Sequence, residues 1–399
     1  MRRERAPVSD LFGPVPGDIV FDEMVDVRRA LHRRPELSME EHLTTKVIRD
    51  HMKALGIDEA IRTSETGGIF AMEGGRPGRT VVVRGDIDGL PVQEDAGRVV
   101  HSEVDGVMHA CGHDVHVASV LGAASVLASR REDLPGRYVF VLQPGEEALC
   151  GAKTMLEGGA LSVMEGGRLT GFHVTSLLPT GMVALRNGIA MSEAHSLRIE
   201  LHGPGGHGAV PSAPGDVVRA TAVLVSLLPS VVDGLTYEGS VCVCSAGTLT
   251  AGTAVNVVPT SARVTGTLRT FTAEQREDAV ARLRALCDSV AADQEVHIEL
   301  TLPEQTPAVV NDPAVTELVD AEAKAVLGAD NVLRIPPTQP SDDVSEFLER
   351  LPGCYFFVGG GPRDGSGGMH HSPSFFVEDG SLRTGASVLV RSALALATP

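Results

Sequence analysis

The sequence contains no tryptophan, and phenylalanine and tyrosine together make up only 4% of it. The core of this 399-residue chain must therefore consist mainly of valine, leucine, alanine and isoleucine. A hydrophobic content of 43% is enough for a large core, and the length suggests two or three domains.

Basic residues are also scarce. Lysine and arginine number 34 against 52 acidic residues, which gives a formal net charge of -18. This excess argues against nucleic acid or an anionic membrane as the main partner, because both favour a basic surface. The apolar run 117–128 is too short to span a bilayer. The basic start, Met1–Arg5, leads into a stretch with Pro and Asp, so we expect no secretory signal.

Six cysteines in a chain of this length do not form a disulfide framework. Cys111 lies between two histidines, His109 and His113, where a thiol is more useful as a metal ligand or a nucleophile. We therefore expect a reducing, cytoplasmic environment.

An α/β pattern covers most of the chain. Near-continuous apolar runs that end in polar or glycine-rich residues are typical of strands buried on both faces of a parallel sheet. A helical stretch at 114–129 separates two of these runs, and the carboxyl ends of such strands meet at one edge of the sheet, where ligands bind. The runs are 80–84, 138–142, 169–172 and 354–358.

Residues 191–304 follow a different order, β-α-β-β-α-β, which is the order of a ferredoxin-like domain. Thr272–Gln275 has the form of a capping box that begins the second helix. We therefore predict a mostly parallel-sheet catalytic domain, residues 1–190 and 305–399, with helices on both faces, interrupted by an inserted ferredoxin-like α+β domain. The predicted strands of the insert are 195–201, 240–249, 261–269 and 296–302, and its helices are 216–228 and 272–292.

The densest group of potential metal ligands is His109, Cys111, His113 and His116. If Met108–Asp114 is extended, the first three share one face, because side chains alternate along a strand. Imidazole and thiolate favour Zn, Co, Ni or Mn-like ions over Ca or Mg. The alternative is a polar loop whose histidines cap helices.

Two pairs of carboxylates follow predicted strands. Glu146 and Glu147 either are solvated or divide two tasks, one binding metal while the other handles the proton of a bound water. Asp86 and Asp88 either form an acidic turn, or bind metal directly or orient a metal-binding histidine.

Five further residues are weak signals alone. His173 and His371 lie near strand ends or in a glycine-rich loop. His207 is the single imidazole of a glycine-rich loop in the insert, and such glycines permit close approach to a ligand. Asn256 and Arg269 bracket a strand pair and either recognise a carboxylate or carbonyl of the substrate or are ordinary surface residues.

Taken together and in order, these segments resemble the aminoacylase/carboxypeptidase-like dinuclear metallohydrolases, a metallopeptidase family. The similarity is greatest to their amidohydrolase branch, with its hippurate hydrolases, N-acyl-amino-acid amidohydrolases and indole-acetyl-amino-acid hydrolases, and it covers the chain from about residue 25. The motifs that carry it are Asp86–Pro91, His109–Asp114, Gln143–Glu147, Gly205–His207, Asn256–Pro259 and His371–Phe375.

The resemblance implies two divalent metal ions (Mn, Zn, Co or Ni) and a role for each matching residue. Glu146 matches the general base, and Asp88 the acid that orients the ligands. His207 matches a lid histidine that stabilises the oxyanion, and Asn256 a lid residue that contacts substrate. The implied metal ligands are Cys111, His113, Glu147, His173 and His371.

The expected function is hydrolysis of the amide bond of an N-acyl amino acid or similar small N-acylated substrate. The resemblance implies that the inserted domain is both lid and dimerisation surface, so we expect a homodimer or a dimer-based oligomer. The alternatives are a dipeptidase or carboxypeptidase, a thiol hydrolase with Cys111 as nucleophile, and a binding protein without activity. Departures from the family pattern at Gly145, Gly208 and Ser212 leave the metal ligands intact and bear on acyl preference.

Overall fold

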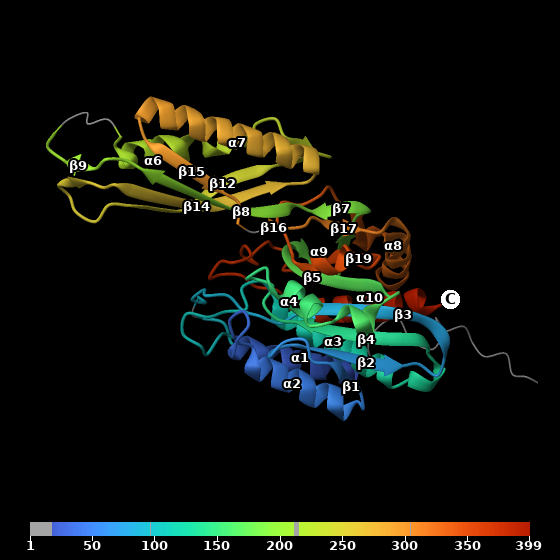
Figure 1. Cartoon of the computed structure of the whole chain (residues 1–399). Coiled ribbons are helices and arrows are strands. Elements are labelled where there is room, and N and C mark those ends of the chain that lie inside the picture. Colours follow the sequence, from blue (N-terminus) through green and yellow to red (C-terminus); the bar gives the residue numbers. More distant parts are fainter. Residues whose placement is uncertain (1–17, 96, 211–214, 304) are drawn as a thin grey trace, which may run out of the picture. The chain divides into compact units, whose positions relative to one another are not determined.

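The computed structural model describes residues 18–95, 97–210, 215–303 and 305–399, and its chain divides into two compact units (Figure 1). Each unit has its own cluster of buried hydrophobic side chains. Unit 1 comprises Met1–Gly188, Val310–Ile335 and Asp343–Pro399, and unit 2 comprises Ile189–Val309 and Pro336–Asp342. Among the described residues, no helix has both the length and the apolar character needed to cross a membrane.

Unit 1 is built on an eight-stranded sheet in the order β1-β2-β4-β3-β5-β19-β6-β18. The central strands β4, β3, β5 and β19 are mutually parallel, which confirms the predicted mostly parallel α/β fold. The edges are mixed, because β1, β2 and β4 pair antiparallel and so do β19 and β6. The strands are β1 (Asp58–Ile61), β2 (Gly68–Glu73), β3 (Arg76–Asp86), β4 (Pro135–Gln143), β5 (Arg168–Pro179), β6 (Val183–Leu185), β18 (Val332–Arg334) and β19 (Gly353–Gly361).

Helices cover both faces of this sheet. The larger layer contributes apolar side chains to the main core together with one face of the strands, and it consists of α1 (Asp18–Arg33), α2 (His42–Ala54), α3 (His113–Ala128), α8 (Pro313–Leu327) and α10 (Gly380–Ala397). The smaller layer contacts the other face and consists of α4 (Gly151–Glu157), α5 (Leu161–Met164) and α9 (Val344–Leu348). Two 3₁₀ helices, Arg131–Asp133 and Ala329–Asn331, complete the unit.

Unit 2 has an antiparallel sheet in the order β12-β14-β8-β15. In chain order this is strand 2, 3, 1 and 4, which is the ferredoxin-like arrangement predicted for the insert. The two helices begin at the expected caps, because Asp216 accepts from the N–H groups of Val218 and Arg219 and Thr272 accepts from that of Gln275. The elements are β8 (Glu193–His202), α6 (Val217–Leu227), β12 (Val243–Ala251), β14 (Ser261–Thr270), α7 (Ala273–Gln294) and β15 (His297–Thr301).

One shorter strand extends the sheet of unit 2, and the others form separate two-stranded sheets. β16 (Gln305–Thr306) pairs with β8, and β9 (Gly206–His207) pairs with β13 (Val257–Val258). The remaining short elements are β7 (Gly188–Met191) with β17 (Val309–Asn311), β10 (Thr236–Tyr237) with β11 (Ser240–Val241), and the 3₁₀ helix Leu228–Val232.

Candidate metal centre

The segment 108–114 is not extended, so the condition under which His109, Cys111 and His113 would share one face of a strand is not met. Gly112 has a left-handed backbone (φ 90°) as the N-cap of α3, and His113 is the first residue of that helix. A Cβ atom on Gly112 would lie 2.4 Å from a methyl carbon of Val174, so only glycine fits there without a shift. The turn, not strand alternation, brings Cys111 and His113 to one side.

The five predicted ligands and Glu146 lie in one cluster in unit 1. Their ligand atoms form three overlapping groups, and within each group the atoms lie within 4.8 Å of one another. His173 comes from the middle of β5, Glu146 and Glu147 from the loop after β4, and His371 from a loop after β19. The groups are Cys111 with His113 and His173, Cys111 with Glu147 and His371, and His113 with Glu146 and Glu147.

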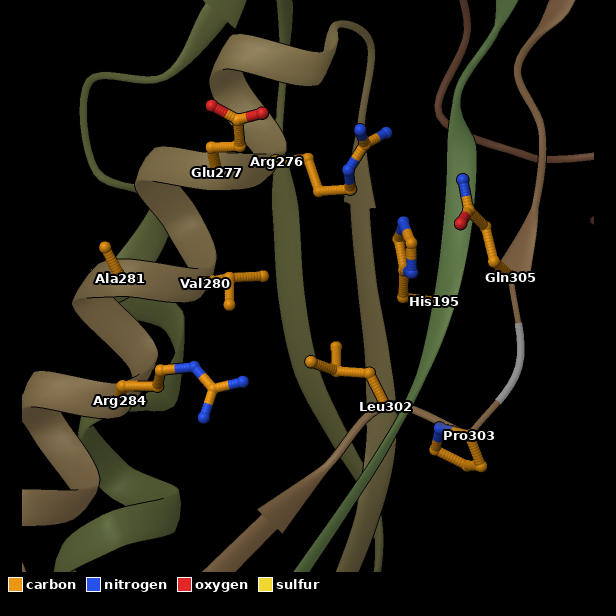
Figure 2. A pocket seen from close by; sticks show the side chains of 9 residues that line it. All are labelled: His195, Arg276, Glu277, Val280, Ala281, Arg284, Leu302, Pro303 and Gln305. Carbon is orange, nitrogen blue, oxygen red and sulfur yellow. The ribbon is translucent and has the colours of Figure 1, made fainter.

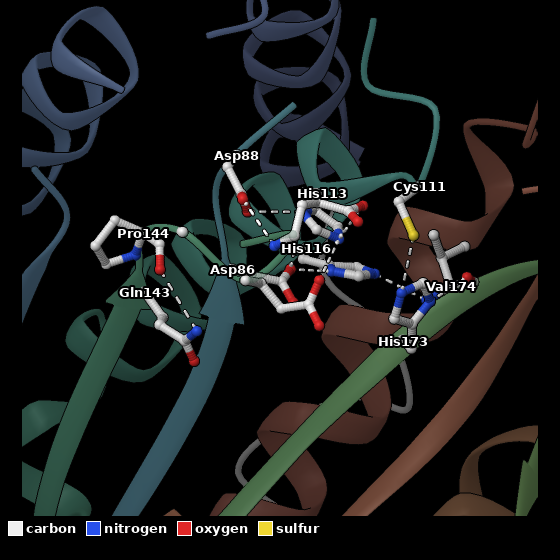
Figure 3. A network of polar contacts seen from close by, with 12 residues as sticks. Asp86, Asp88, Cys111, His113, His116, Gln143, Pro144, His173 and Val174 are labelled. Carbon is white, nitrogen blue, oxygen red and sulfur yellow. Dashed lines mark hydrogen bonds and ion pairs between the residues drawn. The ribbon is translucent and has the colours of Figure 1, made fainter. Parts of the chain in front are cut away.

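The side chains of this cluster point toward one another. Figure 3 shows Cys111 facing His173, and the Sγ to Nε2 distance is 3.3 Å. Glu147 Oε1 lies 3.5 Å from His371 Nε2 and 3.8 Å from His113 Nε2, and Glu146 Oε2 lies 3.9 Å from the same His113 atom. Thiolate, imidazole and carboxylate groups at these separations can share metal ions without a large rearrangement.

Asp88 holds three parts of the site together. One of its oxygens lies 3.1 Å from His113 Nδ1 (Figure 3), and the other accepts from Ser38 Oγ at 2.6 Å and from the Glu147 N–H at 3.0 Å. Burial opposes ionisation of Asp88, but the hydrogen bonds from His113 and Ser38 outweigh it and lower its pKa. Because Nδ1 donates to Asp88, the His113 ring, once it gives up its second proton, presents the Nε2 lone pair to the glutamates.

His116 makes two contacts beside the metal centre that were not predicted from the sequence. Its Nδ1 bonds to Asp86, its Nε2 accepts the Val174 N–H at 2.8 Å, and it stands three residues after His113 on α3. The neighbouring His173 donates from Nδ1 to the Val174 carbonyl at 2.7 Å, which leaves Nε2 facing Cys111. The spacing on one helix face is the signal that could have suggested this role.

Two buried atoms of the cluster indicate that a cation belongs there. His113 Nε2 and Glu147 Oε1 have no hydrogen-bond partner among the described residues. Burial raises the pKa of Glu147 to about 7, and burial with Glu147 nearby raises the pKa of the Cys111 thiol well above its usual range. Burial opposes protonation of His113, yet Asp86 and Asp88 raise its pKa to about 10. The negative electrostatic potential of the nearby carboxylates, which favours a proton on His113, also favours a divalent cation. The residues present are therefore suited to hold a pair of metal ions.

Two other histidines near the centre have different surroundings. His109, a member of the cluster predicted from the sequence, is buried, joins none of the metal-ligand groups, and has no partner for either ring nitrogen among the described residues. His370 was considered from the sequence only as part of the weak His370–Pro373 segment and was not predicted as a ligand, but its Nδ1 lies 3.7 Å from Cys111 Sγ and its Nε2 3.3 Å from Thr175 Oγ1. Gly145, a departure from the family pattern, is left-handed (φ 63°), and a Cβ there would lie 2.6 Å from Met39 Sδ.

The predicted substrate residues of unit 2 separate into two places. His207 and Asn256 lie together, because β9 pairs with β13 and the Gly208 N–H donates to the Asn256 carbonyl at 2.9 Å. Arg269 lies near the other end of β14, where it donates to Ser341 Oγ at 2.9 Å and to the Gln339 carbonyl at 3.2 Å. Ser212 lies outside the described residues.

Comparison with known proteins gives a match over nearly the whole chain. Residues 82–395 match the profile described as Peptidase family M20/M25/M40. An N-acetylcysteine deacetylase of Bacillus subtilis (strain 168) is 34% identical over 360 residues, covering 90% of this chain and 93% of that protein. Thermostable carboxypeptidase 2 of Saccharolobus solfataricus is 32% identical over 384 residues, covering 94% and 96%. The crystal structure of Bacillus subtilis YXEP protein, described as a dinuclear metal binding peptidase from the M20 family, has a TM-score of 0.80 at 30% identity and covers 96% of this chain and 99% of that chain.

Proposed function

The chain belongs to the peptidase family M20/M25/M40, and we propose that it is a metal-dependent amidohydrolase that cleaves the amide bond of an N-acyl amino acid or a similar small N-acylated substrate. The observation that carries this proposal is Glu146 beside the five-ligand cluster. A carboxylate that only bound metal would not need a second carboxylate next to it in the chain, whereas a hydrolase needs both a ligand and a base.

The proposed reaction assigns a separate task to each group. Cys111, His113, Glu147, His173 and His371 would hold two divalent ions (Mn, Zn, Co or Ni), and these ions would supply Lewis acidity to the carbonyl and to the attacking water. Glu146 removes a proton from that water and returns it to the leaving amine. Asp88 keeps His113 in the tautomer that presents Nε2 to the cluster.

Unit 2 is proposed as the lid, with His207 as the oxyanion donor. His207 Nδ1 accepts the Ala209 N–H at 3.0 Å, so the neutral ring carries its proton on Nε2, where it can donate to a developing oxyanion. Asn256, which lies beside it, and Arg269 are proposed substrate contacts. By resemblance, the same unit is proposed as the surface of a homodimer.

Two alternatives make different demands on the site. A peptidase or carboxypeptidase is supported by the relative named thermostable carboxypeptidase 2 and uses the same metal centre on a different substrate. A thiol hydrolase requires a reactive thiolate, but burial and nearby Glu147 raise the pKa of Cys111 well above its usual range, which disfavours the thiolate without a metal.

The test measures release of free amine from N-acetyl, N-benzoyl and N-indole-acetyl amino acids and from dipeptides. The enzyme is stripped with a chelator and refilled separately with Mn, Zn, Co or Ni. We expect turnover of the acylated amino acids that disappears on stripping and returns with metal. Turnover of dipeptides alone would favour the peptidase, and turnover that survives stripping but not alkylation would favour Cys111.

The first variant to test is Glu146→Gln, which keeps the shape of the side chain and removes the base. We expect turnover to fall by at least about a hundredfold, the usual contribution of a general base, while metal content stays at the wild-type level. Full turnover of the variant with metal bound would exclude Glu146 as the base.

A further inference from the structure

A groove in unit 2 lies between α7, His195 on β8 and residues Leu302, Pro303 and Gln305, and its lining residues include none of the metal centre (Figure 2). Its volume of about 680 Å³ is within the range of small-molecule sites. Val280 on α7, together with Leu302 and Pro303 after β15, gives it an apolar lining. Apolar lining with a few polar groups at defined positions is the usual composition of a ligand site.

His195 on β8 contributes a buried polar atom to this groove. The side chain is only 7% exposed, and its Nε2 has no hydrogen-bond partner among the described residues. The carboxylate of Glu193 is 3.9 Å away, beyond hydrogen-bond distance, and already accepts from Thr270 and from Arg276 at 2.7 Å. A buried ring nitrogen without a partner is costly, so a bound molecule with a polar atom at this position would be stabilised.

Arg284 on α7 contributes a cation without a counter-charge. It forms no ion pair with any described residue, although acidic residues outnumber basic ones in the chain by 52 to 34. Arg276, two turns earlier, differs because its charge is balanced by Glu193. Glu277 also borders the groove, but Figure 2 shows its carboxylate directed away from Arg284 and His195.

We propose that this groove binds a small organic carboxylate with an apolar body. The carboxylate pairs with the guanidinium of Arg284, whose two parallel N–H groups match its two oxygens. The apolar body lies against Val280, Leu302 and Pro303, and a second polar atom, in ligands that carry one, bonds to His195 Nε2. A phosphate dianion fits less well, because the groove offers one unpaired cation and carries Glu277 on its border.

The site is independent of the reaction proposed for unit 1. All residues that line the groove belong to unit 2, whereas the proposed metal ligands and Glu146 belong to unit 1. If the carboxylate proposal is disproved, the amidohydrolase proposal therefore stands unchanged. If the amidohydrolase proposal is disproved, the carboxylate proposal likewise stands.

The experiment is calorimetric titration of the full-length, metal-loaded protein with hexanoate. The test variant is Arg284→Gln, and the matched control is Arg282→Gln, because Arg282 stands on the same helix, pairs with Asp278 at 2.7 Å and does not line the groove. We expect saturable binding that weakens at least about tenfold in Arg284→Gln and is unchanged in Arg282→Gln. A loss of affinity of about tenfold is the effect usually expected when a hydrogen bond to a charged group is removed. Circular dichroism verifies that both variants fold.

Two further ligands test the two halves of the proposal. Hexanol lacks the carboxylate and acetate lacks the apolar body, so each should bind at least about tenfold more weakly than hexanoate. Hexanoate bound at the metal centre would be insensitive to Arg284→Gln. Equal binding by wild type and Arg284→Gln, equal binding of hexanol and hexanoate, or no saturable binding by the wild type would each overturn the proposal.

Discussion

Asp88 contacts three separate segments of unit 1 through one carboxylate: the first residue of α3, the loop at Ser38 and the loop at Glu147. In Asp88→Asn, the amide nitrogen replaces one acceptor, so either His113 or the Ser38 and Glu147 donors lose a partner. We expect metal affinity to fall about 10–100-fold, as for other groups that orient metal ligands. Competition with a chelator of known affinity measures the change.

Ser38→Ala is the control for this substitution, because it removes one donor to Asp88 and leaves the His113 contact in place. Its effect on metal affinity should be clearly smaller than that of Asp88→Asn. Wild-type affinity in Asp88→Asn would mean that His113 is oriented without Asp88.

Single residues show where sequence reasoning succeeds and where it stops. Cys111 and Glu147 could be assigned as candidates because ligand types at fixed spacing form recognisable motifs. Ser38 could not, because it lies fifty residues from Asp88 in a loop that has no motif or periodicity of its own. His109 was grouped with Cys111 because the alternation rule was applied to a segment that turns at Gly112.

At the scale of elements, the start of α3 depends on Gly112. Gly112→Ala places a methyl group in a left-handed backbone and against Val174, next to His173. We expect a loss of about 1–3 kcal/mol in unfolding free energy and weaker metal binding, because Cys111 or His173 must move. Gly106→Ala is the control, since Gly106 is also left-handed (φ 74°) but a Cβ there meets no atom within 4 Å. Equal effects on metal affinity would contradict the proposed clash.

The contact between α1 and α3 has a titratable pair, His32 with Asp114. Burial disfavours the charged form of His32, but Asp114 at 3.0 Å and Glu94 at 3.3 Å outweigh it and raise the pKa to about 9. Because the folded-state pKa lies above the unfolded value of about 6.5, the charged His32 stabilises the fold fully below pH about 6.5 and loses this effect as pH rises through about 9.

His32→Gln tests this contribution. We expect the difference in unfolding free energy between wild type and variant to be up to about 3 kcal/mol larger at pH about 6 than at pH about 9.5. Urea unfolding of both proteins across this range measures it, and the subtraction removes the other titrating groups. A difference that does not change with pH would mean that the pKa of His32 is the same in the folded and the unfolded protein.

The elements themselves were predicted well where their periodicity is strong. The helix predicted at 216–228 forms as Val217–Leu227 with Asp216 as its cap, and the strand predicted at 261–269 forms as Ser261–Thr270. His173 was placed at a strand end, but β5 continues to Pro179. The continuation was not predicted because polar and apolar residues alternate only weakly after His173. The short strands β1, at one edge of the sheet, and β6, between β19 and the other edge strand β18, were missed, since short strands have too few residues to show a period.

At the scale of the whole molecule, the two units have separate hydrophobic clusters. Leu121 on α3 belongs to the cluster of unit 1, and Leu283 on α7 to that of unit 2, and both side chains are buried. Truncation of a buried leucine to alanine lowers the unfolding free energy by about 2–5 kcal/mol. The unit that is destabilised is the one whose core contains the new cavity. The two substitutions are therefore matched in chemistry and differ only in location.

We expect Leu283→Ala to destabilise unit 2 and to leave metal affinity at the wild-type value, because all the proposed ligands are in unit 1. Leu121→Ala should destabilise unit 1 and weaken metal binding, because α3 begins at His113. Calorimetric unfolding with and without metal separates the two cases, since bound metal raises only the transition of the unit that holds it. A single transition that both variants lower equally, with the same response to metal, would mean that the two cores unfold as one cooperative structure despite having no common cluster.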